Sequence, residues 1–171
     1  MAYTPEQLSD LQCIRDAVMR YAHGLDRLDP EHMATAYWPD ATDDHGPSGA
    51  GSATDYIATA MASHSRWSPS IHTLLNHLVE LDDDGVHARG ETYCVAHLFD
   101  TEQPAMYQWF GRYLDRFEKR GDEWRILERV VVHDAGQLHD PVVPMPFPTD
   151  QFKQGTFDRP ADGRPIGPWR D

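Results

Sequence analysis

The repeat distance of apolar residues changes once along this chain, and that change limits the folds that it can adopt. Between residues 5 and 28, apolar side chains recur every three or four positions, which predicts a single amphipathic helix. Pro5 suits the first turn of this helix and Thr4 suits its cap. Two shorter helices are expected at about 30–38 and 53–65. The first part of the chain therefore predicts three helices.

Beyond residue 70, apolar and polar side chains alternate with a period of two, as they do along β-strands. Turn sequences at 82–85 and 120–122 separate the alternating runs and predict an antiparallel meander. The expected strands are 71–81, 86–99, 105–119 and 123–134, with a further short strand at about 42–46. Three helices followed by a curved antiparallel sheet predict an α+β fold, with the helices packed on one face of the sheet.

A chain of 171 residues suits one domain, which we expect to span residues 1–138. The remaining segment, 139–171, holds seven of the 13 prolines and so cannot form a long helix or a central strand. Large aromatic residues are spread along this tail, which predicts that it packs over a pocket mouth or over a neighbouring subunit. A partly ordered tail is the alternative, because chain ends are often poorly ordered.

The charge of the chain argues against several classes of partner. Twenty-eight acidic residues against 15 basic residues give a net charge of -13, which repels the phosphates of nucleic acids. No apolar run approaches the roughly 20 residues that cross a membrane, and the first residues lack the features of a secretory signal. Cys13 and Cys94 have no metal-binding spacing and are interpreted as reduced core residues. We therefore expect a cytoplasmic protein that binds neither nucleic acid nor membrane.

Cofactors and metals leave sequence signatures that this chain does not carry. The sequence has no Walker loop, no GxGxxG and no HExxH. Among the ten histidines, only His45 lies in a compact acidic cluster, with Asp43 and Asp44, and that spacing matches no structural metal site. Nucleophilic catalysis is also disfavoured, because there is no GxSxG and neither cysteine has an activating neighbour. We expect neither a cofactor nor a metal.

Two residues are candidates for acid–base chemistry, and each also has a simpler explanation. Asp26 falls at the end of the first helix, beside its apolar stripe, where the helix dipole disfavours a carboxylate. A bond to Arg27 or to a turn amide would satisfy it. His72 shares one strand face with Leu74 and Asn76, so it could line a pocket. It could equally be a core histidine bonded to a backbone carbonyl.

Six segments together resemble the SnoaL-like branch of the nuclear-transport-factor-2-like superfamily, over about residues 8–136. They are YAHGLDRLD at 21–29, YWPDATDDHG at 37–46, IH at 71–72 with Asn76, GETY at 90–93, GRYLDRFE at 111–118 and WRI at 124–126. The resemblance implies a strongly curved sheet that forms a cone with an internal pocket for a small hydrophobic molecule. It also implies a homodimer or homotrimer.

Dehydratases and dehydrochlorinases of this superfamily use an Asp–His dyad in a closed pocket without a cofactor. The resemblance places this aspartate at Asp26 and this histidine at His72. In such a dyad the histidine removes a proton from carbon, while the aspartate fixes its tautomer and stabilises the imidazolium. The resemblance therefore makes Asp26 and His72 the expected catalytic pair.

Two departures from the dehydrochlorinases move the expected chemistry away from loss of halide. Tyr21 stands where those enzymes have a lysine, and simple alternation places no inward-facing arginine on the last strand. Side chains that hydrogen-bond an oxygen are present instead. The expected substrate-binding residues are Tyr21, His45, Asn76, Tyr93, Tyr113 and His133.

The resemblance thus implies a cofactor-independent lyase that acts on a small hydrophobic, aromatic oxygenated substrate. Such an enzyme would release water or formaldehyde, as in the catabolism of lignin-derived aromatic compounds. A ketosteroid-type isomerase or a dehydrohalogenase on the same fold is one alternative. A ligand-binding or dimerisation module without catalysis is another, because fold alone does not decide function.

Overall fold

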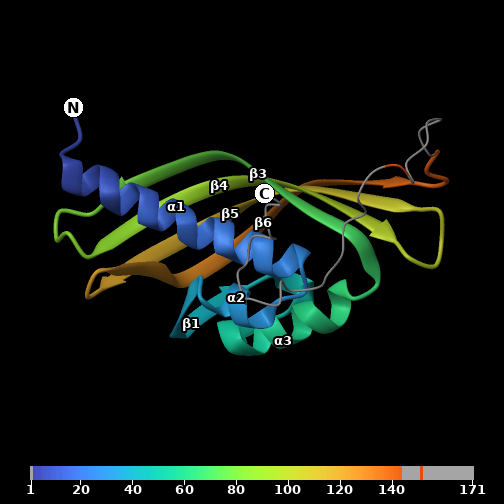
Figure 1. Cartoon of the computed structure of the whole chain (residues 1–171), viewed down its shortest axis with the longest axis horizontal. Coiled ribbons are helices and arrows are strands. Elements are labelled where there is room, and N and C mark those ends of the chain that lie inside the picture. Colours follow the sequence, from blue (N-terminus) through green and yellow to red (C-terminus); the bar gives the residue numbers. More distant parts are fainter. Residues whose placement is uncertain (1, 144–150, 152–171) are drawn as a thin grey trace.

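The computed structural model describes residues 2–143 and 151 of the chain. Three α-helices and a single six-stranded sheet make up this part of the molecule, with one short 3-10 helix, η1, at Gly46–Ser48 (Figure 1). The helices are α1 (Pro5–Asp26), α2 (Pro30–Ala34) and α3 (Ala53–His64). The strands are β1 (Tyr37–Asp44), β2 (Ala50–Ser52), β3 (Trp67–Leu81), β4 (His87–Asp100), β5 (Met106–Arg120) and β6 (Glu123–His139).

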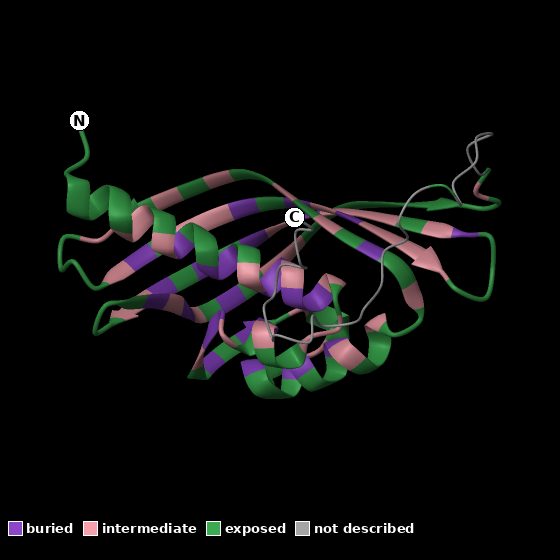
Figure 2. Cartoon of the chain, viewed as in Figure 1, coloured by how far each residue is buried: buried purple, intermediate pink, exposed green. Residues whose placement is uncertain are grey.

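Local capping explains where the first helix begins. Pro5 occupies its first turn, and Thr4 and Gln7 form a reciprocal capping box, with Thr4 N donating to Gln7 Oε1 at 2.9 Å and Gln7 N donating to Thr4 Oγ1 at 3.2 Å. One side of α1 is buried against the sheet, whereas its outer side is exposed (Figure 2). The buried side chains include Ile14, Val18, Tyr21 and Leu25, at the three- and four-residue steps that the sequence predicts.

The sheet has the strand order β2-β1-β6-β5-β4-β3 and curves around the helices without closing (Figure 1). The four long strands β3, β4, β5 and β6 form the expected antiparallel meander. β1 pairs parallel with β6, so the sheet as a whole is mixed. The α+β cone predicted from the sequence is confirmed, with this parallel edge added to it.

The short second helix is the clearest difference from the sequence expectation. A helix was expected over about 30–38, but α2 ends at Ala34, and Tyr37 and Trp38 begin β1. Hydrogen bonding explains the change, since Ile126 N on β6 donates to Ala36 O at 2.9 Å and holds this stretch against the sheet edge. Tyr37 and Trp38 bury apolar surface in either conformation, so apolar spacing alone could not choose between them.

Register shifts interrupt the alternation on two of the long strands. On β3, Leu74 pairs with Cys94 and His77 pairs with Thr92, so β3 has one extra residue between them. On β6, Ile126 pairs with Phe117 and Glu128 with Arg116, which leaves Leu127 as the extra residue. Two further shifts lie between Trp67 and Ser70 on β3 and between the partners of Phe110 and Gly111 on β6. The bulges after Leu74 and at Leu127 reverse which side chains face the helices, and both reversals affect the site described below.

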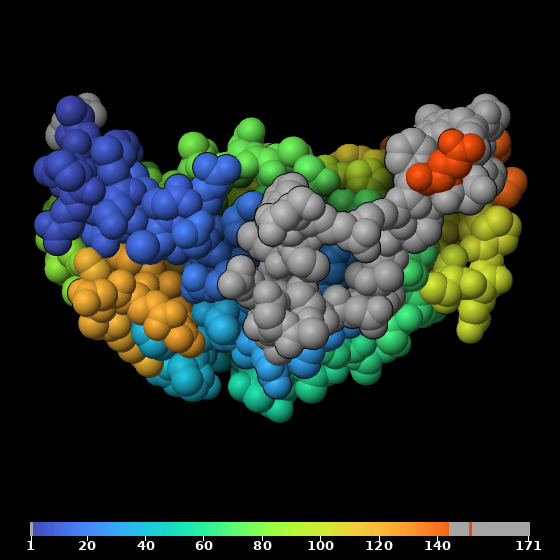
Figure 3. Space-filling model, viewed as in Figure 1, coloured from blue at the N-terminus to red at the C-terminus, as the bar shows by residue number. Residues whose placement is uncertain are grey.

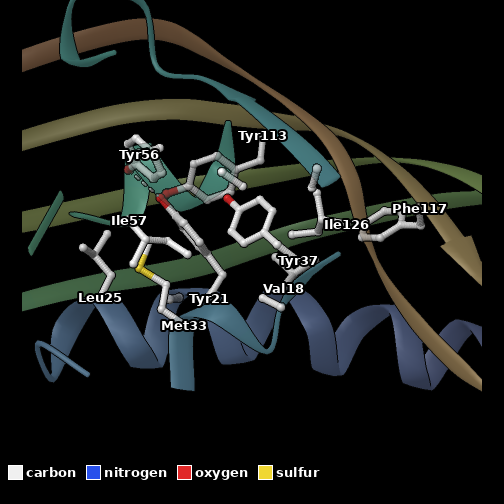
Figure 4. Packing of buried hydrophobic residues seen from close by; sticks show 14 of the residues in the cluster. Val18, Tyr21, Leu25, Met33, Tyr37, Tyr56, Ile57, Tyr113, Phe117 and Ile126 are labelled. Atoms are coloured by element: carbon white, nitrogen blue, oxygen red, sulfur yellow. Dashed lines mark hydrogen bonds between the residues drawn. The ribbon is translucent and has the colours of Figure 1, made fainter. Parts of the chain in front are cut away.

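The hydrophobic core lies between the helices and the concave face of the sheet. Its centre is aromatic, with Tyr21 from α1, Tyr37 from β1, Tyr113 from β5 and Tyr56 from α3 grouped together (Figure 4). At the other end of α1, Asp10 accepts hydrogen bonds from Lys119 Nζ at 2.9 Å and from Trp124 Nε1 at 2.8 Å. Figure 3 shows the same contact on the surface, where the orange end of the β5–β6 hairpin lies against the first half of α1.

Two sequence expectations concern the ends of the domain. β6 continues to His139, five residues beyond the expected end at 134, and the rest of the tail lies almost entirely outside the described residues. Its packing over a pocket or a subunit therefore stays a prediction. In the part of the chain that the structure describes, no helix has the length and apolar character needed to cross a membrane.

Candidate active site

A cavity of about 480 Å³ lies between the ends of the helices and the concave face of the sheet. Helices α1 and α3, residues 45–48 and the four long strands contribute to it. Its wall is mostly apolar and includes a set of titratable side chains. Its residues are Tyr21, Leu25, His45, Gly46, Pro47, Ser48, Tyr56, His64, His72, Ala96, Leu98, Trp109, Tyr113, Val131 and His133. This combination of apolar wall and convergent polar groups is typical of a small-molecule site.

His72 lines this cavity and is hydrogen-bonded to Asp26, which is not among the lining residues. The Asp26 carboxylate accepts three hydrogen bonds from β3: from His72 Nδ1 at 2.6 Å, from His72 N at 2.8 Å and from Ser70 Oγ at 3.0 Å. Because a carboxylate only accepts, His72 carries its proton on Nδ1, and Nε2 keeps a lone pair. The three donors also explain how a carboxylate is tolerated at the C-terminal end of a helix.

Another histidine, His64 at the end of α3, lies beside this pair. Its ring centroid is 5.8 Å from that of His72, and its Nδ1 donates to the carbonyl of Ala60 at 3.1 Å. Burial, followed by the neighbouring His72, lowers the pKa of His64 to about 4. His64 is therefore a neutral imidazole at neutral pH and adds no positive charge beside His72.

A second Asp–His pair reaches the same cavity from β1. His45 Nδ1 hydrogen-bonds Asp43 Oδ1, and the other oxygen of Asp43 accepts from Tyr37 Oη at 2.6 Å. Asp43 is fully buried, and the ring of His45 stacks on Tyr56 with centroids 3.9 Å apart. Desolvation lowers the pKa of His45, although Asp43 opposes this shift.

Two tyrosines continue this pair along the cavity wall. Tyr21 Oη lies 3.1 Å from His45 Nε2 and 3.1 Å from Tyr56 Oη. The contact between the hydroxyl groups of Tyr21 and Tyr56 is the dashed line in Figure 4. Burial raises the pKa of both phenols well above the ordinary value, so both are protonated at neutral pH.

Arg129 lies behind the cavity wall and corrects a sequence expectation. No inward-facing arginine was expected on the last strand, yet Arg129 is completely buried, because the bulge at Leu127 turns its side chain inward. Its Nε and Nη2 each donate to Asp115 at 2.7 Å, and its guanidinium lies 4.2 Å from the ring centroids of Tyr21 and Tyr113. It is not among the residues that line the cavity.

The predicted substrate-binding residues divide into two groups. Tyr21, His45, Tyr113 and His133 line the cavity. Asn76 and Tyr93 do not, and both have exposed side chains. The bulge after Leu74 gives the inward position to His77 instead of Asn76, and Tyr93 lies on the outer face of β4, where Arg112 is 5.9 Å from its ring.

Three aromatic residues of the cavity were not among the sequence candidates: Tyr56, His64 and Trp109. A signal for His64 was available, because it lies eight residues after Tyr56 and four after Ala60 on the same predicted helix face. Burial raises the pKa of Cys94 to about 11, so this buried thiol is protonated and is no nucleophile. Within residues 2–143 and 151, no group of three or more metal-binding side chains has an arrangement that could hold an ion.

The fold and the cavity together define a class of protein: an α+β cone with paired acids and histidines in an interior pocket. The chain belongs to the SnoaL-like domain family, whose model matches residues 6–130. No curated protein matches it in sequence. The resemblance to the SnoaL-like branch is thereby confirmed, and the fold is that of the nuclear-transport-factor-2-like proteins.

Solved structures show the same fold at low sequence identity. A scytalone dehydratase-like protein from Novosphingobium aromaticivorans is 18% identical, with a TM-score of 0.70 over 88% of this chain and 100% of that chain. Hexachlorocyclohexane dehydrochlorinase LinA-type3 from Novosphingobium barchaimii is 17% identical, with a TM-score of 0.72 over 82% and 97%. A protein of unknown function from Mycobacterium tuberculosis, Rv3472, is 25% identical, with a TM-score of 0.62 over 78% of each chain.

Proposed function

We propose that this protein is a cofactor-independent lyase that acts on a small, aromatic, oxygenated compound. The observation that carries the proposal is the Asp26–His72 pair, in which His72 lines a mostly apolar cavity and is hydrogen-bonded to Asp26 at 2.6 Å. The family and its dehydratase-like and dehydrochlorinase neighbours support lyase chemistry in general. The substrate class and the roles of individual residues are our proposal.

In this mechanism His72 Nε2 transfers the proton at a substrate carbon. Asp26 holds Nδ1–H, which keeps Nε2 available and stabilises the imidazolium that forms when Nε2 takes up a proton. A carbon next to an aromatic ketone is acidic enough for such a transfer, and a hydroxyl group on the adjacent carbon can then leave as water with the proton that His72 returns. When a hydroxymethyl group leaves as formaldehyde, its hydroxyl proton is lost instead, and the carbon next to the ketone takes up a proton from His72. The aromatic side chains of the cavity, such as Trp109 and Tyr113, suit a substrate that carries aromatic rings.

Loss of halide is less well supported by the same geometry. The only arginine that β6 turns toward the helices, within the described residues, is Arg129. Both of its bonds to Asp115 are made behind the wall, so it is not placed to receive a leaving halide in the cavity. Tyr21, in place of a lysine, is neutral at neutral pH.

Deuterium exchange tests the proton transfer without requiring the natural substrate. The wild-type protein in D2O should exchange the acidic CH2 protons of deoxybenzoin, a two-ring ketone, and NMR follows the loss of signal. His72→Ala should abolish this exchange, and Asp26→Asn should slow it by about 10²–10⁴-fold, because the amide can present the wrong hydrogen-bonding group to Nδ1.

The control is His87→Gln, which removes a histidine from a surface pair with Asp84 that has a similar 2.7 Å hydrogen bond. This variant should exchange deoxybenzoin at the wild-type rate. Full exchange by a well-folded His72→Ala protein would rule out the proposed role of His72. Absence of exchange in the wild type would instead favour the binding module that lacks catalysis.

A further inference from the structure

The second Asp–His pair ends a chain of hydrogen bonds that the proposed function does not use, and the direction of these bonds can be assigned. Asp43 can only accept, so His45 carries a proton on Nδ1 and donates it to Asp43. Tyr37 donates to the remaining oxygen of Asp43 at 2.6 Å, which fixes the carboxylate. The buried end of this chain of hydrogen bonds is therefore fully paired.

The directions of the next two hydrogen bonds follow from the same assignment of donors and acceptors. With its proton on Nδ1, a neutral His45 has an acceptor at Nε2, so Tyr21 Oη donates to it across 3.1 Å. The oxygen of Tyr21 then accepts from Tyr56 Oη, also at 3.1 Å (Figure 4). Tyr56 lies in the cavity wall, so its oxygen offers an acceptor lone pair at the cavity end.

Every proton along this chain thus points from the cavity toward Asp43. The opposite direction would need a second proton on His45, and burial lowers the pKa of this imidazole. In the resting state the guanidinium of Arg129, 4.2 Å from the Tyr21 ring, also disfavours a second proton on His45. When His45 takes up the proton of Tyr21, the hydrogen bond and the charge of Asp43 stabilise the imidazolium. In its resting state the chain is arranged to accept a proton from a hydroxyl group in the cavity.

We propose that Tyr56, acting through Tyr21 and the Asp43–His45 pair, is a second proton-transfer arm that removes the proton of a substrate hydroxyl group. The reaction that this arm supports is cleavage of the carbon–carbon bond next to that hydroxyl, with release of an aldehyde. The inference rests on the proposed function, in which His72 transfers the proton at carbon. Tyr56 is the catalytic residue of the arm, while Tyr21, His45 and Asp43 act through it.

The steps balance without any further reactant. The hydroxyl proton passes to Tyr56 as the proton of Tyr56 passes to Tyr21 and that of Tyr21 passes to His45 Nε2. The electron pair of the O–H bond forms the C=O bond of the aldehyde, and the neighbouring carbon–carbon bond breaks. Its electron pair enters the aryl ketone as an enolate. The enolate carbon takes a proton from His72 Nε2, which takes up that proton from solvent before the bond breaks. His45 then returns its extra proton to solvent, so both histidines regain their resting state.

The probe is the α-hydroxymethyl derivative of deoxybenzoin, because its two possible products differ. Action of the arm yields formaldehyde and deoxybenzoin, whereas loss of water yields the α-methylene ketone. The wild-type protein should release formaldehyde. Tyr56→Phe and His45→Gln should lower this release by about 100-fold or more, since general acid–base groups typically contribute 10²–10⁴-fold to one step. The loss of release should exceed any loss of deuterium exchange of deoxybenzoin by at least about 10-fold.

Matched controls are Tyr107→Phe, a half-exposed tyrosine of β5 outside the cavity, and His87→Gln at the surface Asp84 pair. Both should release formaldehyde at the wild-type rate. Three outcomes would contradict the proposed role of Tyr56. They are wild-type release in a folded Tyr56→Phe protein, an equal loss of release and of exchange, and the α-methylene ketone as sole product. Failure of the exchange itself would instead overturn the role of His72, so the two proposals fail separately.

Discussion

Arg129 carries its charge in the centre of the protein, with no exposed surface and, within the described part of the chain, a single acidic hydrogen-bond partner, Asp115. Two short bonds to that partner and two tyrosine faces at 4.2 Å replace the water that the guanidinium loses. One nitrogen, Nη1, has no hydrogen-bond partner among the described residues. This arrangement makes the pair sensitive to loss of either member, because the other charge would stay buried alone.

Removal of one partner of this pair should destabilise the fold strongly. We expect Arg129→Met and Asp115→Asn each to lower the free energy of unfolding by about 3–5 kcal/mol, as for other buried pairs. Urea unfolding followed by tryptophan fluorescence measures this change. Arg66 provides the control, because its side chain is half exposed and its partner Asp100 also accepts hydrogen bonds from two backbone N–H groups. Arg66→Met should cost no more than about 1 kcal/mol. Equal small effects at both sites would contradict the account given for Arg129.

At the scale of the element, the contact between α1 and α2 depends on the absence of a side chain at Gly24. A Cβ at this position would lie 2.5 Å from Met33 N and 2.7 Å from Met33 Cα, both of them backbone atoms that cannot rotate away. Gly24 is also two residues before Asp26. The close approach of the two helices therefore bears on the position of the candidate catalytic carboxylate.

Gly24→Ala should consequently destabilise the protein, although alanine is the better helix former. We expect a net loss of about 1–3 kcal/mol in the free energy of unfolding, because overpacking outweighs the gain in helix propensity. Gly136→Ala is the control, since its Cβ would meet nothing closer than 3.5 Å. If the Gly24→Ala protein proved as stable as the wild type in thermal melts, the helices would have to move apart easily.

The sequence predicts some elements well and others poorly, for reasons that differ from element to element. The α1 stripe and the period-two runs of the long strands follow from spacing alone, and those elements lie where they were expected. The bulges at β3 and β6 have no such signal, so Asn76 was placed inward and Arg129 was not. The approach of Asp26 to His72, 46 residues apart, came from the family resemblance, because periodicity cannot bring two elements together.

Across the whole molecule, several buried histidines make stability depend on pH. Burial lowers the pKa of His23, His45 and His77, and it lowers that of His64 to about 4. Between that value and about 6.5 the unfolded chain binds more protons than the folded protein. The stability of the fold should therefore be complete above about pH 6.5 and fall as the pH drops toward 4.

His64 alone should account for about 2 kcal/mol of the loss between about pH 7.5 and pH 5. Unfolding in urea at the two pH values measures this loss, which should be smaller by that amount in His64→Gln. His87 provides a control of opposite sign, because pairing with Asp84 raises its pKa and its contribution is lost as the pH rises. His87→Gln should therefore not reduce the acid loss, and an unchanged loss in His64→Gln would contradict the assignment.

The outer face of the sheet carries a larger depression, about 550 Å³, which contains none of the histidines. Exposed Leu78, Leu114 and Val130 line it, with arginines and glutamates around them. We propose that a second copy of the chain covers this groove, in a homodimer or homotrimer, because its mixed charges can pair with those of an identical surface.

Light scattering after size-exclusion chromatography tests this association. The wild type should have the mass of two or three chains, and Leu78→Glu should shift it toward one chain by placing a charge in the apolar contact. Leu8→Glu, at an exposed leucine of α1 away from the groove, should leave the mass unchanged. A wild-type protein with the mass of one chain would contradict the proposed association.

The extra residue at Leu127 separates two parts of β6 whose side chains have different roles. Before it, Trp124 and Ile126 are packed into the core, and a change there is a change in folding. After it, Val131 and His133 face the cavity, and a change there alters what the pocket can hold. An engineer who wants a new substrate preference could therefore vary Val131 and His133 while Trp124, Ile126 and Arg129 on the same strand keep the protein folded.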